Sequence, residues 1–231
     1  TKPTQHSVKA LLEYGVQPDI LVCRTEHELN KDIRRKVALF CNVAPNAVIE
    51  SIDTDSIYNV PILMQEEELD KVVLNKLNMP DTNEPKLDDW KKFLFSLKNP
   101  TSVVSIGLIG KYIELKDAYK SIAEAFIHAG VANECKVNLT WIHSESIDDK
   151  NVQKKLKGLK GILVAPGFGE RGIEGKVTAI KYARENSIPF LGICLGMQCA
   201  VIEFARNVLG MPDAHSTEMN KIIISSVIHL L

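Results

Sequence analysis

Apolar runs bounded by turn residues alternate with amphipathic stretches along most of the chain. Short apolar runs are typical of strands, and apolar residues recurring every three to four positions indicate one face of a helix. In the first part, the expected strands are residues 19–23 and 47–51, and the expected helices are residues 7–14, 31–41 and 62–77. Alternating strands and helices predict a mostly parallel sheet.

Residues 80–101 interrupt this alternation. Turn-forming residues surround one amphipathic helix, expected at residues 88–97: Pro80, Asp81, Asn83, Pro85 and Pro100. Such composition is typical of a linker. We therefore expect separate units at residues 1–79 and 102–231.

A second series of strands and helices begins at residue 102. The expected strands are residues 103–109, 136–142, 161–164 and 188–193, and the expected helices are residues 117–128, 152–156, 174–185 and 197–208. This pattern predicts a doubly wound sheet with its site at the carboxyl ends of the strands. The expected fold class is α/β, with two doubly wound, mostly parallel units that are both incomplete.

The strongest chemical signal is a cysteine between two glycines. Cys194 stands between Gly192 and Gly196, after an apolar run at residues 188–191 that we expect to be a buried strand. This is the spacing of a nucleophile elbow, a strained strand-to-helix turn that exposes the nucleophile. The turn leaves the next backbone N–H, on Leu195, free for an oxyanion, and the helix N-terminus favours a thiolate. The alternative is a buried structural cysteine beside a glycine turn.

A glycine-rich loop at residues 165–172 follows the strand expected at 161–164. Glycine lets a backbone N–H approach a ligand without a Cβ in the way, so Gly167 is the expected second oxyanion donor. Alone, such a loop indicates only a turn. Together with Cys194, it predicts acyl transfer through a thioester.

The loop and Gly-Ile-Cys-Leu-Gly-Met-Gln at residues 192–198 resemble the class I glutamine amidotransferases. Further segments narrow the resemblance to the CTP synthase family: residues 1–8, 17–24, 110–121, 171–176, 182–186 and 216–218. The resemblance covers residues 1 to about 220. It implies that residues 1–79 are the C-terminal part of the synthetase domain and residues 102–231 a truncated amidotransferase domain.

The resemblance implies an enzyme that makes CTP from UTP, ATP and ammonia released from glutamine at Cys194. It implies that glutamine is held by Gly167, Leu195, Gly196, Met197, Gln198 and Glu218. It implies UTP or inhibitory CTP at Lys2, Gln5 and Lys36, ATP near Arg24, and the activator GTP near Arg171. Mg²⁺ would bind outside these residues. For Glu218 and the lysines, the alternative is an ordinary solvated surface residue.

Composition limits the partners and the cellular location that we expect. The net charge of −1 gives no reason to expect nucleic acid or a membrane surface as a partner, and no apolar run reaches the length of a membrane span. The five cysteines are scattered without metal-ligand spacing, so we expect reduced thiols, no metal site and a cytoplasmic location. The resemblance implies a homotetramer that can form filaments. Because the chain starts at Thr1 within a motif, we expect a fragment.

Two departures from the family matter. Its phosphate-binding glycine-rich loop is absent, and so is the His-x-Glu pair that follows its nucleophile as base and orienter. His143-Ser144-Glu145 has the spacing but precedes Cys194, so we expect it to be non-catalytic and this chain alone to be inactive. The apolar residues 221–231 read as a strand or short buried segment outside the family pattern. The alternative functions are a glutaminase component of another amidotransferase and a non-catalytic nucleotide-binding fragment.

Overall fold

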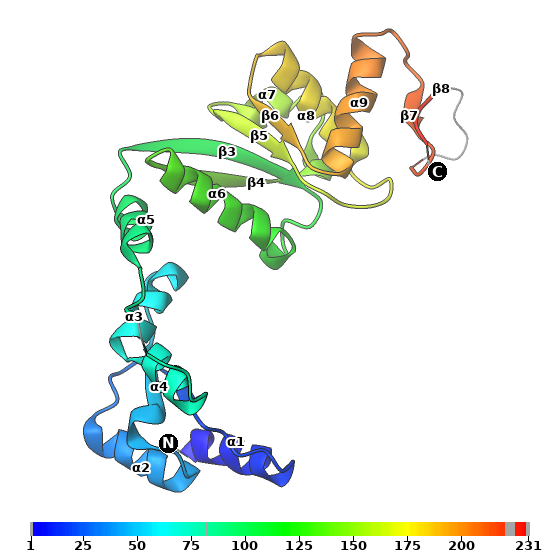
Figure 1. Cartoon of the computed structure of the whole chain (residues 1–231). Coiled ribbons are helices and arrows are strands. Elements are labelled where there is room, and N and C mark those ends of the chain that lie inside the picture. The colour runs from blue at the N-terminus through cyan, green and yellow to red at the C-terminus, as the bar shows by residue number, and fades with distance from the viewer. Residues whose placement is uncertain (1, 82, 220–224, 230–231) are drawn as a thin grey trace. The chain divides into compact units, whose positions relative to one another are not determined.

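The computed structural model describes residues 2–81, 83–219 and 225–229 (Figure 1). The chain divides into two compact units, Thr1–Phe95 and Ser96–Leu231. The division falls within helix α5 (Asp88–Lys98), inside the segment expected as a linker. Each unit is described by itself.

The first unit is built on two parallel strands, β1 (Leu21–Thr25) and β2 (Val48–Ile52). Its helices and 3₁₀ turns are α1 (Lys2–Glu13), α2 (Lys31–Cys41), η1 (Pro45–Ala47), η2 (Ile57–Asn59), α3 (Val60–Glu66) and α4 (Leu69–Lys76). Helices α1 and α2 bury Val8 and Val37 against Val48 of β2. The next residue, Ile49, packs with Val72 of α4 in a separate cluster, because successive side chains of a strand point to opposite faces.

The prediction of a single helix at residues 62–77 is wrong. Helix α3 ends at Glu66 and α4 begins at Leu69, with Glu68 in the left-handed region at φ 57°. The cause is tertiary, because the Glu67 carboxylate accepts from the Arg34 guanidinium at 2.9 Å and from the Glu50 N–H at 2.9 Å. These bonds end the helix within an otherwise continuous amphipathic pattern.

The second unit contains a four-stranded parallel sheet in the order β4-β3-β5-β6. The strands are β3 (Ser102–Gly110), β4 (Cys135–His143), β5 (Gly161–Val164) and β6 (Phe190–Gly192). After β4 the chain returns to the other side of β3, where β5 and then β6 add. Open α/β sheets bind ligands where the strand order reverses in this way, at the carboxyl ends of the strands. Here that place lies between β3 and β5.

Helices cover both faces of this sheet, which confirms the expected α/β fold with parallel sheets (Figure 1). They are α6 (Lys120–Ala132), preceded by η3 (Lys116–Tyr119), and α7 (Val152–Leu156), preceded by η4 (Ser144–Ser146), then α8 (Ile173–Glu185) and α9 (Leu195–Asn207). Leu108 and Leu163 pack with Phe126 of α6 on one face. Their neighbours Ile109 and Val164 face the cluster formed with α7, α8 and α9.

The last two expected strands have different outcomes. The expected buried strand at 188–191 is instead a partly exposed β6, with Phe190 37% and Leu191 57% exposed, because β6 is an edge of the described sheet. Beyond α9, β7 (Ala214–Ser216) pairs in parallel with β8 (Ser225–Ile228). A strand therefore lies within residues 221–231 as expected, although 221–224, 230 and 231 lie outside the described residues. None of the described helices combines the length and apolar character needed to cross a bilayer.

Candidate active site

Cys194 occupies a strained turn between β6 and α9. Its backbone has φ 53° and ψ −110°, it precedes the first residue of α9, and it is exposed. A non-glycine residue in such a conformation costs about 1–3 kcal/mol and persists where the surrounding structure enforces it. The exposed position excludes the alternative of a buried structural cysteine.

The two glycines around Cys194 are there because backbones approach closely. A Cβ on Gly196 would stand 2.1 Å from the Val164 carbonyl oxygen, and a Cβ on Gly192 would stand 2.5 Å from the Gly196 carbonyl carbon. The Ile193 N–H also donates to the Val164 oxygen at 3.1 Å. The end of β5 therefore sets the path of the turn that carries Cys194.

Among the described residues, two backbone N–H groups near Cys194 have no acceptor. The Gly196 N–H donates to the Ile193 oxygen at 2.9 Å, whereas the Leu195 N–H has no acceptor within the described residues. Gly167 lies next to Leu195, since a Cβ built on it would be 3.5 Å from Leu195 Cδ2. The Gly167 N–H likewise has no acceptor in the part of the chain that the structure describes. The fold thus places Gly167 against the Leu195 side chain.

Two buried lysines under the glycine-rich loop were missed by the sequence analysis. Lys176 is fully buried and its Nζ donates to the Ala165 oxygen at 3.3 Å. Lys111 is 3% exposed and its Nζ donates to the Phe168 oxygen. Burial lowers the pKa of both ammonium groups. The sequence gives little warning, because lysine is almost always a surface residue.

A second thiol near Cys194 has the opposite character. Cys199 on α9 is fully buried, and burial raises its pKa to about 11. A buried thiol with a raised pKa is unreactive, since the thiolate is the nucleophile. The structure therefore separates an exposed Cys194 from an inert Cys199 only five positions later.

The other residues expected to hold glutamine lie on α9 and after β7. Met197 is exposed, and Gln198 carries a buried Oε1 that has no hydrogen-bond partner within the described residues. Glu218 is exposed, and its N–H donates to Ser216 Oγ at 3.3 Å. The adjacent Met219 is buried in the same cluster as Leu195, which ties the Glu218 segment to the elbow.

His143 and Glu145 contact each other through a backbone N–H rather than through the Glu145 carboxylate. The Glu145 N–H donates to His143 Nδ1 at 3.3 Å, but the Glu145 carboxylate pairs with Arg171 Nε at 3.0 Å. His143 Nε2 lies 3.8 Å from Glu114. The Arg171 guanidinium lies 5.9 Å from the centre of the Tyr112 ring. Arg171, which we expect near GTP, belongs to the glycine-rich loop and is held there by Glu145.

In the first unit, the residues expected near UTP lie on two helices packed against each other. Lys2 and Gln5 are on α1, and Lys36 is on α2. Both lysines are exposed, and Gln5 is half-buried.

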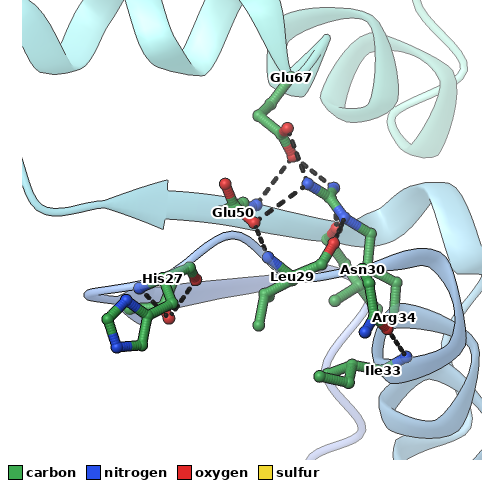
Figure 2. Close-up of polar contacts among 9 residues, drawn as sticks. His27, Leu29, Asn30, Ile33, Arg34, Glu50 and Glu67 are labelled. Atoms are coloured by element: carbon green, nitrogen blue, oxygen red, sulfur yellow. Dashed lines mark hydrogen bonds and ion pairs between the residues drawn. The ribbon is translucent and has the colours of Figure 1, made fainter.

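Helix α2 is fixed in this unit by Arg34, as Figure 2 shows. The guanidinium donates to both oxygens of Glu67, to the Leu29 oxygen at 3.1 Å and to the Val48 oxygen at 3.2 Å. The Glu50 carboxylate accepts from the Leu29 N–H. These bonds join α2 to β2 and α3, and they hold the segment that carries Lys36.

Arg24, expected near ATP, lies at the end of β1. Its Nε donates to Asp53 Oδ1 at 2.9 Å, and this hydrogen bond raises the pKa of the guanidinium. Both side chains are largely exposed. No cluster of three His, Cys, Asp or Glu side chains that could hold a metal ion occurs among the described residues.

Two known protein families match this chain, one in each of its two compact units. The family described as CTP synthase N-terminus matches residues 1–79, and the family described as glutamine amidotransferase class-I matches residues 114–226. CTP synthase of Cytophaga hutchinsonii is 65% identical over 231 residues, which are 100% of this chain and 43% of that protein. CTP synthase of Methanocaldococcus jannaschii is 56% identical over 237 residues, with 100% and 44% covered.

A solved structure is similar to the second part. The glutaminase domain of Trypanosoma brucei CTPS with bound acivicin is 40% identical, with a TM-score of 0.52, and the match covers 55% of this chain and 50% of that one. The chain spans less than half the length of the curated relatives named above. Over its full length the chain is similar to CTP synthases, and residues 114–226 match the class-I glutamine amidotransferases.

Proposed function

We propose that Cys194 hydrolyses glutamine through a thioester. The observation that carries this proposal is the exposed Cys194 at φ 53°, with the free N–H groups of Leu195 and Gly167 beside it. The sulfur attacks the side-chain amide carbon, and the two N–H groups bind the resulting oxyanion. As the C–N bond breaks, the leaving nitrogen takes up the proton that the thiol gave up and departs as ammonia. Water then hydrolyses the thioester to glutamate and free thiol.

Glutamine is held beside this centre by backbone and side-chain groups of the elbow: Gly167, Leu195, Gly196, Met197, Gln198 and Glu218. The unpartnered buried Oε1 of Gln198 supports this role, because a buried acceptor is costly until a donor reaches it. The exposed carboxylate of Glu218 suits the ammonium group of the substrate. Proton transfer needs a base outside this constellation, because Glu145 is already paired with Arg171.

The whole protein, on this proposal, activates UTP with ATP and uses the ammonia to make CTP. Residues 1–79 are the closing part of the synthetase domain, which is supported by their position before the amidotransferase match at residues 114–226. Lys2, Gln5 and Lys36 contact UTP or inhibitory CTP, Arg24 lies near ATP, and Arg171 near the activator GTP. Lysine suits phosphate as a compact charge. Mg²⁺ would neutralise nucleotide phosphates, and no described cluster of this chain would hold it.

We also propose, from the resemblance to CTP synthases, that the whole protein works in the cytoplasm as a homotetramer that can assemble into filaments. The two alternatives are weaker. The match of residues 1–79 to a CTP synthase family argues against another amidotransferase, and the free donors at Cys194 argue against a non-catalytic fragment.

The test is Cys194→Ala in a CTP synthase of the relatives' full length that carries these 231 residues. CTP formation from glutamine should be lost, whereas formation from added ammonia should continue, because the synthetase site needs only ammonia. Cys199→Ala is the matched control, since Cys199 is buried and its thiol is inert. Loss of both activities in Cys194→Ala would make Cys194 structural.

A further inference from the structure

Lys111 is a buried cation at the place where the sheet order reverses. It directly follows β3, whose neighbour β5 leads into the glycine-rich loop. Only 3% of the residue is exposed. The charge of Glu145 reaches Lys111, but that carboxylate pairs with Arg171 instead. Burying a lysine costs free energy unless its ammonium group is paired or hydrogen-bonded.

In the structure, the Lys111 ammonium group binds the glycine-rich loop. Lys111 Nζ donates to the Phe168 oxygen and reaches the Gly169 oxygen at 3.5 Å. A Cβ on Gly167 would stand 3.0 Å from Lys111 Cε and 3.5 Å from Leu195 Cδ2. Gly167 is therefore enclosed between the lysine stem and the residue that follows Cys194.

Lys111 is itself held by a buried tyrosine. The Tyr119 hydroxyl accepts from the Lys111 N–H at 3.2 Å and from the Tyr112 N–H at 3.4 Å. Tyr119 is 3% exposed, and it lies so close that a Cβ on Gly110 would stand 2.6 Å from its hydroxyl oxygen. Gly110 makes room for Tyr119, Tyr119 fixes the Lys111 backbone, and Lys111 fixes the loop.

We propose that Lys111 is a positioning residue for the oxyanion site, which it maintains by binding carbonyl oxygens of residues 168 and 169 so that Gly167 stays against Leu195. The inference rests on the proposed glutaminase function. The carbonyls of residues 168 and 169 directly follow Gly167, so their bonds to Lys111 fix the backbone on the C-terminal side of Gly167. A displacement of about 1 Å in a catalytic group can cost about 10²-fold in rate.

The experiment uses the full-length protein that carries these residues, with Lys111→Met, Tyr119→Phe and the double variant. Lys154→Met, at an exposed lysine of α7, is the control. Lys111→Met should lower kcat for glutamine hydrolysis about 10- to 100-fold, below the loss of about 10²–10³ for a whole oxyanion donor. KM should stay within about threefold, since the oxyanion forms only after substrate binds. CTP formation from ammonia should not change.

Tyr119→Phe keeps the ring and removes only the hydroxyl, so it should lower kcat about threefold to tenfold. It should add nothing in the Lys111→Met background, because residues acting through one contact are not additive. A kcat within about twofold of the parent, or an effect confined to KM, would overturn the inference. If Lys111→Met does not fold, an unchanged kcat in Tyr119→Phe overturns it.

Amide hydrogen exchange separates this inference from the proposed function. Exchange in the peptide containing residues 167–169 should become faster in Lys111→Met whether or not the protein hydrolyses glutamine. If the parent itself shows no glutaminase activity, the proposed function fails, and the exchange rate still tests loop positioning. Unchanged exchange in Lys111→Met would refute the positioning role of Lys111.

Discussion

Gly196 lies against Val164 so closely that a Cβ built on it would stand 2.1 Å from the Val164 carbonyl oxygen. This contact joins the first turn of α9 to the end of β5. Because Cys194 and Leu195 stand just before Gly196, the same contact sets the position of the nucleophile and of its oxyanion donor.

Gly196→Ala should therefore displace the elbow. We expect glutamine hydrolysis in the full-length protein to fall at least about 10²-fold, comparable to the loss of an oxyanion donor, with ammonia-dependent CTP formation retained. The control is Gly210→Ala, where the added methyl group meets nothing within 4 Å and only a positive φ of 70° is strained. Equal activity losses in the two variants would show that the Gly196 contact has no special role.

The Arg34–Glu67 pair predicts a pH dependence of stability. The hydrogen bond from Arg34 lowers the pKa of Glu67 in the folded state. A lowered folded pKa gives stability that is complete above the unfolded pKa, about 4.3 for glutamate, and is lost as pH falls through the folded value.

Glu67→Gln should cost about 1–3 kcal/mol at pH 7, as expected for a hydrogen bond between charged groups. The difference from the parent should shrink as pH falls below about 4. Urea unfolding at several pH values measures this. Glu66→Gln is the neighbouring control at a residue that does not pair with Arg34. A Glu67→Gln difference that grows at low pH would contradict the assignment.

Lys36→Ala should weaken use of UTP in the full-length protein and leave glutamine hydrolysis unchanged. Loss of one charged phosphate contact corresponds to about 1.5–3 kcal/mol, or roughly a tenfold to hundredfold higher KM for UTP. Lys31→Ala, at another exposed lysine of α2, should behave like the parent. An unchanged KM for UTP in Lys36→Ala would show that Lys36 is an ordinary solvated surface residue.

His143 should not serve as the general base. A base contributes typically about 10²–10⁴ in rate, so steady glutamine turnover by the 231-residue polypeptide should be near background. In the full-length protein, His143→Ala should change glutaminase activity by less than about threefold, because Glu145 is engaged by Arg171 rather than by His143. Strong turnover by the polypeptide that disappears with His143→Ala would make the pair catalytic.

Much of the elbow could be predicted because its physical requirements are local. Gly192 and Gly196 mark close backbone contacts wherever a strand turns into a helix around a nucleophile, so spacing alone indicates Cys194. The break between α3 and α4 was not predictable from periodicity, because it depends on Arg34, which is 33 positions before Glu67. Lys111 was missed for a similar reason, since only the fold brings β3 beside the loop after β5.

The most direct test of the central claim is covalent labelling with an electrophilic glutamine analogue. The 231-residue chain is incubated with this analogue, and labelled peptides are counted by mass spectrometry. Cys194 should carry most of the label, because it is the exposed thiol at a helix N-terminus while Cys41 and Cys199 are buried. Excess glutamine should slow this labelling. Preferential label on Cys23, Cys41 or Cys135, or labelling of Cys194 that glutamine does not slow, would contradict a glutaminase site at Cys194.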